Sequence, residues 1–243
     1  MKKVVIITGG SRGIGAATSK LLAANNYSVC VNYKSNKAMA ESIVGDICNN
    51  GGQAFSFQAD VSIESEVIAL FKAVNNTYGS VTHLVNNAGI LFQQASIADI
   101  SVERFNKILT TNITSCFLCC REALKSMKEG GAIVNVSSAA SRSGSPFEYI
   151  DYAASKGAID TLTKGLSIEV ATMGIRVNGV RPGFIYTEMH ADGGEPNRVE
   201  RLSRQIPMQR GGTPEEVANA ILWLLSDEAS YVTGSFIDLA GGK

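Results

Sequence analysis

Short apolar runs rich in Val and Ile alternate along the chain with longer segments whose apolar residues recur at the spacing of one helix face. Such alternation is typical of a parallel sheet covered by helices on both faces. Strands are predicted at 3–8, 28–32, 54–58, 83–86, 132–137, 176–181 and 236–239. Helices are predicted near 13–25, 36–50, 62–76, 101–128, 151–173 and 214–226. The pattern therefore predicts an α/β fold with a doubly wound parallel sheet of about seven strands.

No repeat, low-complexity tract or Pro/Ser-rich linker divides the 243 residues, so we expect residues 1–243 to form one domain. Segment 187–212 departs from the regular pattern, because it is rich in Gly, Arg and Glu and has no clear apolar period. A long irregular segment between a strand and the last helix is typical of a loop that covers a site. We therefore interpret 187–212 as a candidate lid.

The charges of the chain balance, with 22 Lys and Arg against 22 Asp and Glu and a pI near 6.7. This gives no electrostatic reason to expect a nucleic acid or an anionic membrane as partner, so the expected ligand is a small molecule. No apolar stretch approaches the roughly 18 residues of a membrane span, and Met1-Lys2-Lys3 runs directly into an apolar strand rather than a signal peptide. We expect the protein in the cytoplasm.

Five cysteines are present, and three of them cluster at Cys116, Cys119 and Cys120. An odd number with irregular placement makes a poor disulfide framework, so we expect reduced thiols. The cluster contains a Cys-x-x-Cys pair, but the chain has only two histidines and no second Cys pair at metal-ligand spacing. We interpret the cluster as small buried residues of a helix and predict no metal site. A zinc or redox site is the alternative.

The first predicted strand ends in a glycine-rich turn, Thr8-Gly9-Gly10-Ser11-Arg12-Gly13-Ile14-Gly15, and a helix follows. Glycines at this place let a backbone approach a pyrophosphate at a helix N-terminus. The common G-x-G-x-x-G fingerprint is not met, because the glycines follow the pattern T-G-x-x-x-G-x-G. The turn is therefore a candidate nucleotide site, with an ordinary tight turn as the alternative.

The end of the second predicted strand indicates which dinucleotide would bind. In dinucleotide folds an acidic residue about 20 residues beyond the glycines holds an NAD ribose, whereas a basic residue accommodates the 2′-phosphate of NADP. Here the strand ends in Asn32-Tyr33-Lys34-Ser35, without a carboxylate. Arg12 and Lys34 could both approach a 2′-phosphate and Ser35 adds a donor, so NADP is favoured and NAD is the alternative. Lys34 could also be an ordinary solvated lysine.

Tyr152 and Lys156 are four residues apart on a predicted helix, which places both on one face. An isolated tyrosine has a pKa of about 10, and a neighbouring ammonium lowers it by favouring the phenolate. The two residues are therefore a candidate pair for proton transfer. Tyr149 has no such partner, since the residue four positions later is Ala153.

With these residues in view, the chain resembles the short-chain dehydrogenase/reductase family, through motifs spread from Thr8 to Gly242. In the order of the family they are T-G-x-x-x-G-x-G at 8–15, Asn86-Asn87-Ala88-Gly89, Asn112, Ser137-Ser138, Tyr152-Ala153-Ala154-Ser155-Lys156 and Arg181-Pro182-Gly183. The resemblance implies a single-domain Rossmann-type fold and an oxidoreductase that interconverts a carbonyl and a secondary alcohol by hydride transfer with NADP(H). A non-catalytic NADP(H) sensor on the same fold is the alternative, although a sensor has no need of the Tyr-Lys pair.

The resemblance also assigns catalytic roles to Asn112, Ser138, Tyr152 and Lys156. Tyr152 would act as general acid in reduction and as base in oxidation, and Lys156 would lower its pKa and bind the nicotinamide ribose. Ser138 would stabilise charge on the substrate oxygen, and Asn112 would hold a water that links Lys156 to solvent. Only one of the adjacent serines Ser137 and Ser138 can face the site, and the family pattern favours Ser138.

For the cofactor, the resemblance implies contacts from the glycine turn, the ends of the second to fourth strands, the catalytic helix and the loop after the sixth strand. The residues are Gly9, Ser11, Arg12, Gly13, Ile14, Gly15, Asn32, Tyr33, Lys34, Ser35, Asp60, Val61, Asn86, Ala88, Gly89, Tyr152, Lys156, Pro182, Gly183, Ile185 and Thr187. Asp60 would contact the adenine, Ile185 would meet the nicotinamide carboxamide through its backbone, and Thr187 would reach a phosphate.

The segments that determine the substrate follow no sequence pattern from which it can be identified. The chain is similar to bacterial glucose dehydrogenases and 3-oxoacyl-acyl-carrier-protein reductases, which implies a sugar or a 3-oxoacyl thioester as candidate substrate. Small residues near the start of the helix at 151–173, among them Ala154 and Gly157, permit close approach of a second subunit. The family is typically tetrameric, so we expect a homotetramer or homodimer.

Overall fold

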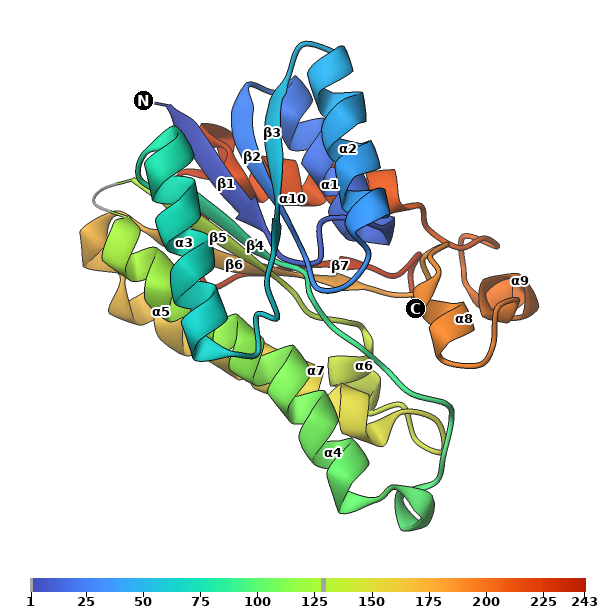
Figure 1. Cartoon of the computed structure of the whole chain (residues 1–243). Coiled ribbons are helices and arrows are strands. Elements are labelled where there is room, and N and C mark those ends of the chain that lie inside the picture. Colours follow the sequence, from blue (N-terminus) through green and yellow to red (C-terminus); the bar gives the residue numbers. More distant parts are fainter. Residues whose placement is uncertain (1, 128–129) are drawn as a thin grey trace.

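The computed structural model describes residues 2–127 and 130–243. The seven strands of this part of the chain lie in one sheet, in the order β3-β2-β1-β4-β5-β6-β7 (Figure 1). They are β1 (Lys3–Ile7), β2 (Tyr27–Tyr33), β3 (Gln53–Gln58), β4 (His83–Asn86), β5 (Ala132–Val136), β6 (Arg176–Pro182) and β7 (Phe236–Leu239). Every neighbouring pair is parallel. The fold is therefore the doubly wound α/β class that the hydrophobic pattern predicts.

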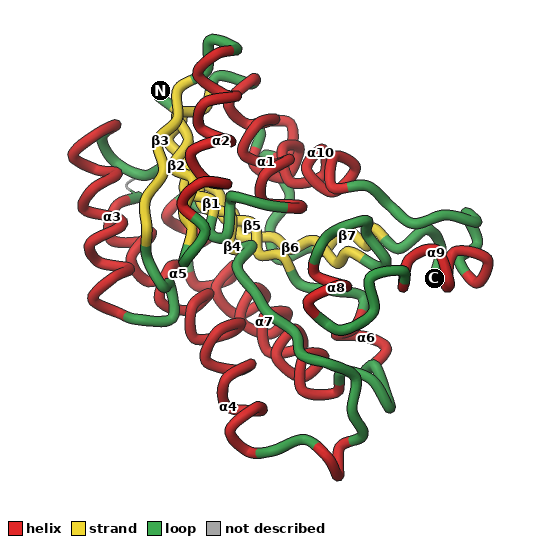
Figure 2. Tube along the Cα trace, turned by 45° about the vertical axis from the view of Figure 1, so that its right-hand side comes forward, coloured by secondary structure: helices red, strands yellow, loops and turns green. Residues whose placement is uncertain are grey.

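Helices cover both faces of the sheet (Figure 2). The longer ones are α1 (Gly13–Ala24), α2 (Lys37–Asn49), α3 (Glu64–Tyr78), α4 (Val102–Leu109), α5 (Ser115–Ser126), α7 (Ile150–Glu169) and α10 (Pro214–Leu225). The short ones are α6 (Ala140–Ser143), α8 (Met189–Asp192) and α9 (Arg198–Leu202). Helices α1, α2 and α10 pack on one face, whereas α3, α5 and α7 pack on the other.

Strand alternation explains why the core has two sides. In β1, Val4 and Ile6 belong to the cluster with α3, α5 and α7, whereas Val5 and Ile7 belong to the cluster with α1, α2 and α10. Successive side chains of a strand point to opposite faces, and a strand covered on both faces is apolar throughout. All four side chains are at most 1% exposed, and burying each contributes about 1.5–3 kcal/mol.

The sheet reverses its strand order at β1, whose neighbours are β2 on one side and β4 on the other. In open α/β sheets, ligands bind outside the carboxyl ends of the strands at such a switch point. The glycine turn follows β1 directly, and the turn at 86–89 follows β4. The topology therefore brings these two motifs together at the expected crevice.

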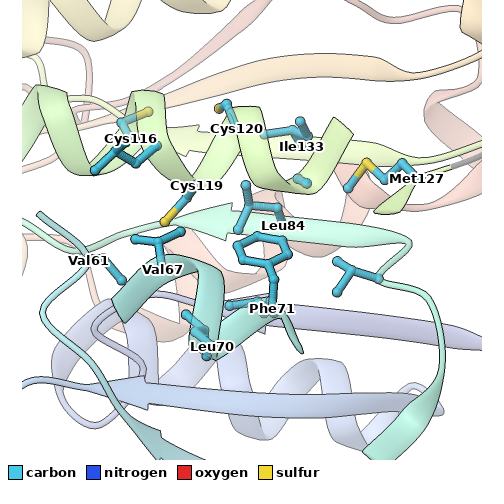
Figure 3. Packing of buried hydrophobic residues seen from close by; sticks show 14 of the residues in the cluster. Val61, Val67, Leu70, Phe71, Leu84, Cys116, Cys119, Cys120, Met127 and Ile133 are labelled. Atoms are coloured by element: carbon cyan, nitrogen blue, oxygen red, sulfur yellow. The ribbon is translucent and has the colours of Figure 1, made fainter. Parts of the chain in front are cut away.

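The cysteine cluster packs into the core (Figure 3). Cys116, Cys119 and Cys120 of α5 are buried beside Phe71 of α3 and Leu84 of β4. Burial raises the pKa of the Cys119 thiol well above its ordinary value, so this thiol stays protonated and unreactive. These cysteines act as small apolar residues of a helix.

The observed helices agree with the predicted ones except in four segments, one of which is α6, where no helix is predicted. The segment predicted as one helix at 101–128 divides into α4, a π-helical turn at Thr110–Thr114, and α5, which ends at Ser126; residue 128 lies outside the described residues. Helix α7 ends at Glu169, and a 3₁₀ turn at Ala171–Met173 follows. The segment 187–212 is more regular than predicted, because it contains α8, α9 and a 3₁₀ turn at Ser203–Gln205. Residue 1 of the expected domain also lies outside the described residues. Within the described residues, no helix is both long enough and apolar enough to cross a membrane.

Candidate active site

The glycine turn after β1 presents backbone N–H groups at the start of α1. The helix begins at Gly13, its N-cap residue Arg12 does not cap it with a side-chain hydrogen bond, and its first turn holds no acidic residue. Gly9 and Gly13 have φ angles of +61° and +49°, and a Cβ on Gly15 would lie 2.2 Å from the Gly9 carbonyl oxygen. Glycine is therefore required here, and the helix start offers free donors and a positive dipole end. This cradle fits a pyrophosphate.

Hydrogen bonds hold the glycine turn after β1 against the ends of two neighbouring strands, β4 and β2. Thr8 Oγ1 accepts from the backbone N–H groups of Asn87 (2.9 Å) and Ala88 (3.0 Å), which ties the turn after β1 to the turn after β4. The Asn87 side chain donates to the carbonyl oxygens of Thr8 and Gly9, both at 3.0 Å. From β2, Asn32 Oδ1 accepts from the Gly9 N–H at 3.3 Å. The turn is therefore braced by the protein itself.

The end of β2 presents a cation that already has a carboxylate partner. Of the cofactor residues predicted after β2 and after β3, the buried ones are Asn32, Tyr33 and Val61, and the exposed ones are Lys34 and Ser35. Lys34 Nζ lies 2.6 Å from Asp60 Oδ2, and Ser62 donates to the other oxygen of Asp60. Burial alone would raise the pKa of the Asp60 carboxyl, but the hydrogen bonds from Lys34 and Ser62 outweigh it and lower the pKa.

Arg12 extends from the glycine turn to the candidate lid. Its guanidinium lies 2.6 Å from the carboxylate of Asp192, the last residue of α8, and the two side chains are 42% and 48% exposed. Thr187, at the start of the lid, lies against Gly13, where an added Cβ would be 3.2 Å from Thr187 Cγ2. The structure therefore places the first residues of segment 187–212 against the start of α1.

The two ends of the lid are joined to each other. Ile185 and Gly212 form a parallel bridge, in which the Tyr186 N–H donates to the Gly212 carbonyl at 3.0 Å and the Gly212 N–H donates to the Phe184 carbonyl at 2.9 Å. Inside the lid, His190 Nε2 donates to the Ile185 carbonyl at 3.0 Å. Burial lowers the pKa of His190 below its ordinary value, so its ring is neutral at pH 7.

Tyr152 and Lys156 lie one turn apart near the start of α7, and both are buried. Lys156 Nζ is 5.4 Å from the centre of the Tyr152 ring and donates to the Val136 carbonyl oxygen, at the end of β5, at 2.8 Å. Burial raises the pKa of Tyr152 to about 12, although a hydrogen bond with Ser138 opposes it, and burial lowers the pKa of Lys156 to about 8. In this structure burial thus outweighs the lowering of the Tyr152 pKa that the sequence predicts.

The adjacent serines Ser137 and Ser138 make different contacts. Ser137 is buried, and its hydroxyl donates to the Lys156 carbonyl oxygen at 3.2 Å. Ser138 is half-buried, its Oγ accepts from the Ala140 N–H at 3.1 Å and donates to the Pro182 carbonyl at 3.5 Å, and it lines the same pocket as Tyr152. The structure therefore brings Ser138 together with Tyr152, whereas Ser137 fixes the backbone of α7.

Asn112 is fully buried in the π-helical turn between α4 and α5. Its Oδ1 accepts from the Ile90 N–H at 2.8 Å, and its Nδ2 donates to the Ile90 carbonyl and to Ser155 Oγ, both at 3.0 Å. An added Cβ on Gly89 would lie 3.4 Å from Asn112 Oδ1 and 3.5 Å from Lys156 Nζ. The side chain therefore braces the loop after β4 against α7, which leaves an acceptor lone pair or the backbone carbonyl for the expected water.

A pocket of about 630 Å³ opens at the carboxyl ends of β5 and β6. Its lining includes the predicted residues Ile14, Ser138, Tyr152, Lys156, Pro182, Gly183, Ile185 and Thr187. The predicted residues outside this lining are Gly9, Ser11, Arg12, Gly13, Gly15, Asn32, Tyr33, Lys34, Ser35, Asp60, Val61, Asn86, Ala88, Gly89 and Asn112. Among these, Asn86 points into the core, where its Nδ2 donates to Asn135 Oδ1 at 2.9 Å and to Cys120 Sγ at 3.2 Å.

The pocket also contains side chains that the sequence analysis does not select. Asn87 lines it, because side chains alternate at the end of β4 and the preceding Asn86 points into the core. Arg198 of α9 lines the pocket at only 4% exposure and binds Glu148, before α7, at 2.5 Å and Glu195 at 2.7 Å. The abundance of Arg and Glu in 187–212 is the one sequence signal of these ion pairs.

Comparison with known proteins agrees with this architecture. A family model described as enoyl-(acyl carrier protein) reductase matches residues 9–243. The chain is 62% identical over 245 residues to the uncharacterized oxidoreductase YgfF of Escherichia coli (strain K12), covering 99% of each chain. It is 37% identical to glucose 1-dehydrogenase 2 of Bacillus subtilis (strain 168), covering 99% of this chain and 94% of that protein. A solved structure of a mutant Serratia marcescens short-chain dehydrogenase/reductase is similar with a TM-score of 0.92 and 32% identity, covering 99% of this chain and 97% of that one.

These likenesses, together with the braced glycine turn, define the chain as an oxidoreductase. It belongs to the short-chain dehydrogenase/reductase family, whose members use NAD(P) and act on small molecules.

Proposed function

We propose that the protein is an NADP(H)-preferring oxidoreductase that interconverts a carbonyl and a secondary alcohol, with Tyr152 as general acid and base. The observation that carries the proposal is that Ser138, Tyr152 and Lys156 line one pocket together with the loop at 182–187. A hydroxyl for the substrate oxygen, a phenol for the proton and an adjacent ammonium are the groups that carbonyl reduction needs.

Each of these side chains has its own part in the proposed reaction. Bound nicotinamide dinucleotide would supply the hydride in reduction and accept it in oxidation. Ser138 donates a hydrogen bond to the substrate oxygen and stabilises the charge that develops there. Tyr152 gives its proton to the same oxygen in reduction and takes it back in oxidation. Lys156 stabilises the phenolate that remains, and a water near Asn112 returns the proton from solvent.

The residues that would hold the cofactor are those of the glycine turn at the start of α1, for its phosphates, and those of the 182–187 loop, for its nicotinamide. Gly9, Ser11, Gly13, Ile14 and Gly15 would contact the phosphates through the turn. The preference for NADP is supported by Arg12 in the glycine turn and by Lys34 and Ser35, because the end of β2 carries a cation and a hydroxyl where an NAD site carries an acid. NAD is the alternative cofactor.

The substrate class is proposed from the pocket and from the relatives. The lining mixes apolar Leu91, Phe184 and Met189 with polar Glu148 and His190, and the volume of about 630 Å³ suits a small molecule. One relative is named glucose 1-dehydrogenase 2, and another, from Staphylococcus aureus (strain Mu50 / ATCC 700699) and 37% identical over 244 residues, is named 3-oxoacyl-[acyl-carrier-protein] reductase. We therefore place a sugar and a 3-oxoacyl thioester first among the substrates to test.

We also propose that the enzyme assembles as a homotetramer or homodimer in the cytoplasm. Val102 and Phe105 on α4 and Phe117 on α5 are 70%, 38% and 47% exposed, and apolar side chains of this size are favourably buried against a second copy. The free, buried thiols of α5 suit a reducing compartment. Light scattering of the purified protein gives the oligomeric state, and a monomer at micromolar concentration would contradict this part of the proposal.

The proposed activity is tested by following NADPH oxidation with the purified protein and a panel of carbonyl compounds. The panel contains an acetoacetyl thioester, simple ketones, aldehydes and ketoses, and the blank is Tyr152→Phe. We expect turnover of at least one compound by the wild type and about 10²- to 10⁴-fold less by the blank. A wild type that binds NADPH but turns over no member of a broad panel would favour the NADP(H) sensor instead.

A further inference from the structure

The candidate lid brings two carboxylates to the place where the proposed function puts phosphates. Asp192 Oδ2 lies 2.6 Å from an Arg12 guanidinium nitrogen. Glu188 follows Thr187 over the start of α1, and its Oε2 would be 3.6 Å from a Cβ added to Gly13. The lid thus supplies anionic oxygens to a cation and to a helix N-terminus, both of which favour negative charge.

We infer that Asp192 is a determinant of nucleotide affinity, because it competes with the 2′-phosphate of the cofactor for Arg12. The inference rests on the proposed function, since it needs Arg12 to be the residue that binds the 2′-phosphate. A guanidinium held by Asp192 must release this carboxylate before it can bind a phosphate. A nucleotide without the 2′-phosphate makes no demand on Arg12, so its affinity is independent of Asp192.

The ion pairs of the lid differ in burial, and the more exposed pair is the easier one to break. We call the part of the lid around Arg198, at the start of α9, its base, and the part around Asp192, at the end of α8, its tip. At the base, the Arg198 side chain is 5% exposed and is held by both Glu148 and Glu195. At the tip, the Arg12 and Asp192 side chains are 42% and 48% exposed, so water and salt screen their attraction. The tip therefore releases at small cost while the base stays in place.

The backbone around Asp192 permits this release. Helix α8 has only four residues, and it is followed by Gly193 and Gly194, the second of which has a φ of +83°. The comparable pair at the end of β2 is different, because Asp60 is also bound by Ser62 in its own turn. Asp192 is thus the carboxylate partner that a nucleotide can displace by moving the tip of the lid.

The test compares the dissociation constants of NADPH and NADH for the wild type and Asp192→Asn, measured by the fluorescence of the bound nucleotide. An exposed ion pair contributes little, so we expect the variant to bind NADPH about two- to fivefold more tightly and NADH with unchanged affinity. The control is Asp46→Asn, which removes the Lys20–Asp46 pair on α1 and α2. This pair is 2.7 Å long with side chains 47% and 50% exposed, so it matches the tested pair closely.

A second readout follows the lid without the full cofactor. Adenosine 2′,5′-bisphosphate should speed the hydrogen exchange of residues 187–194 in the wild type, whereas 5′-AMP should not, and in Asp192→Asn the exchange should be fast before any addition. Equal NADPH affinity for Asp192→Asn and Asp46→Asn, or an equal gain for NADH, would overturn the role of Asp192 and leave the oxidoreductase proposal standing. A wild type that binds neither dinucleotide would overturn the proposed function itself.

Discussion

The ammonium of Lys156 donates a hydrogen bond to the carbonyl oxygen of Val136, 2.8 Å away. This bond joins helix α7 to the end of β5 and holds a cation that is only 3% exposed beside the ring of Tyr152. Burying a charge lowers the stability of the fold unless the charge is fully paired. The site therefore keeps a group that costs stability, which is the pattern expected of a residue retained for chemistry.

The first prediction concerns the pH dependence of stability. The pKa of Lys156 is about 8 in the fold against an ordinary 10.5, so the unfolded chain binds more protons between these values and stability rises with pH there. The cost of Lys156 is thus present in full below pH 8. Between pH 7 and 9.5 the wild type should gain about 2 kcal/mol in free energy of unfolding relative to Lys156→Met.

Chemical denaturation of both proteins across this pH range gives the difference. Lys164→Met, on an exposed position of the same helix, should follow the wild type. Parallel pH curves for the wild type and Lys156→Met would contradict the account of a buried cation.

The second prediction concerns the direction of the reaction. Because the pKa of Tyr152 is raised to about 12, the phenol is protonated at neutral pH and is ready to act as an acid. Alcohol oxidation needs the phenolate, so its kcat/KM should rise about tenfold per pH unit from pH 6 to 8, while that of carbonyl reduction stays nearly flat. Steady-state rates in both directions measure this, and an oxidation optimum near pH 6 would be inconsistent with Tyr152 as the base.

The third prediction separates the two serines. Ser138→Ala removes a hydroxyl that contacts Tyr152 and lines the pocket, so turnover should fall about a hundredfold with little change in stability. Ser137→Ala removes a buried hydrogen bond to the Lys156 carbonyl, so it should cost about 1 kcal/mol of stability and leave most of the turnover. The reverse ranking of the two turnover numbers would assign the substrate contact to Ser137.

The fourth prediction concerns the cofactor. Hydrogen bonds to charged groups contribute about 1.5–3 kcal/mol, so Arg12→Ala should lower the ratio of NADPH to NADH affinity by about 10- to 100-fold. Lys20→Ala, an exposed lysine on the same helix, should leave the ratio unchanged. An unchanged ratio in Arg12→Ala would transfer the preference to another residue and leave the enzyme class untouched.

The sequence predicts the sheet well, because each strand is an apolar run whose burial on both faces leaves a local signal. The strands at 83–86 and 236–239 have the predicted bounds. The π-helical turn around Asn112 leaves no such signal, since its residues keep the approximate period of the flanking helices and a single widened turn depends on tertiary contacts. The short helices α6, α8 and α9 cannot be predicted from the sequence for a related reason, because four or five residues carry too little periodicity.

The candidate site also has a part that the sequence predicts and a part that only the structure shows. Motif residues such as Ser138, Tyr152 and Lys156 can be selected from the chain, and the structure brings these three together. The partners of the predicted cations cannot be selected, because Asp192 is 180 positions from Arg12 and its carboxylate meets the guanidinium only through the path of the lid. The raised pKa of Tyr152 is also beyond the sequence, since it results from burial, a property of the packed site.

The central claim, that Tyr152 transfers the proton, is tested most directly by comparing Tyr152→Phe with Tyr149→Phe. Both tyrosines are buried and line the same pocket, but only Tyr152 has Lys156 one turn later. On the best substrate of the panel, Tyr152→Phe should lose about 10²- to 10⁴-fold in turnover while binding NADPH as the wild type does, and Tyr149→Phe should stay within about tenfold of the wild type. Normal turnover by a folded, NADPH-binding Tyr152→Phe would contradict the mechanism.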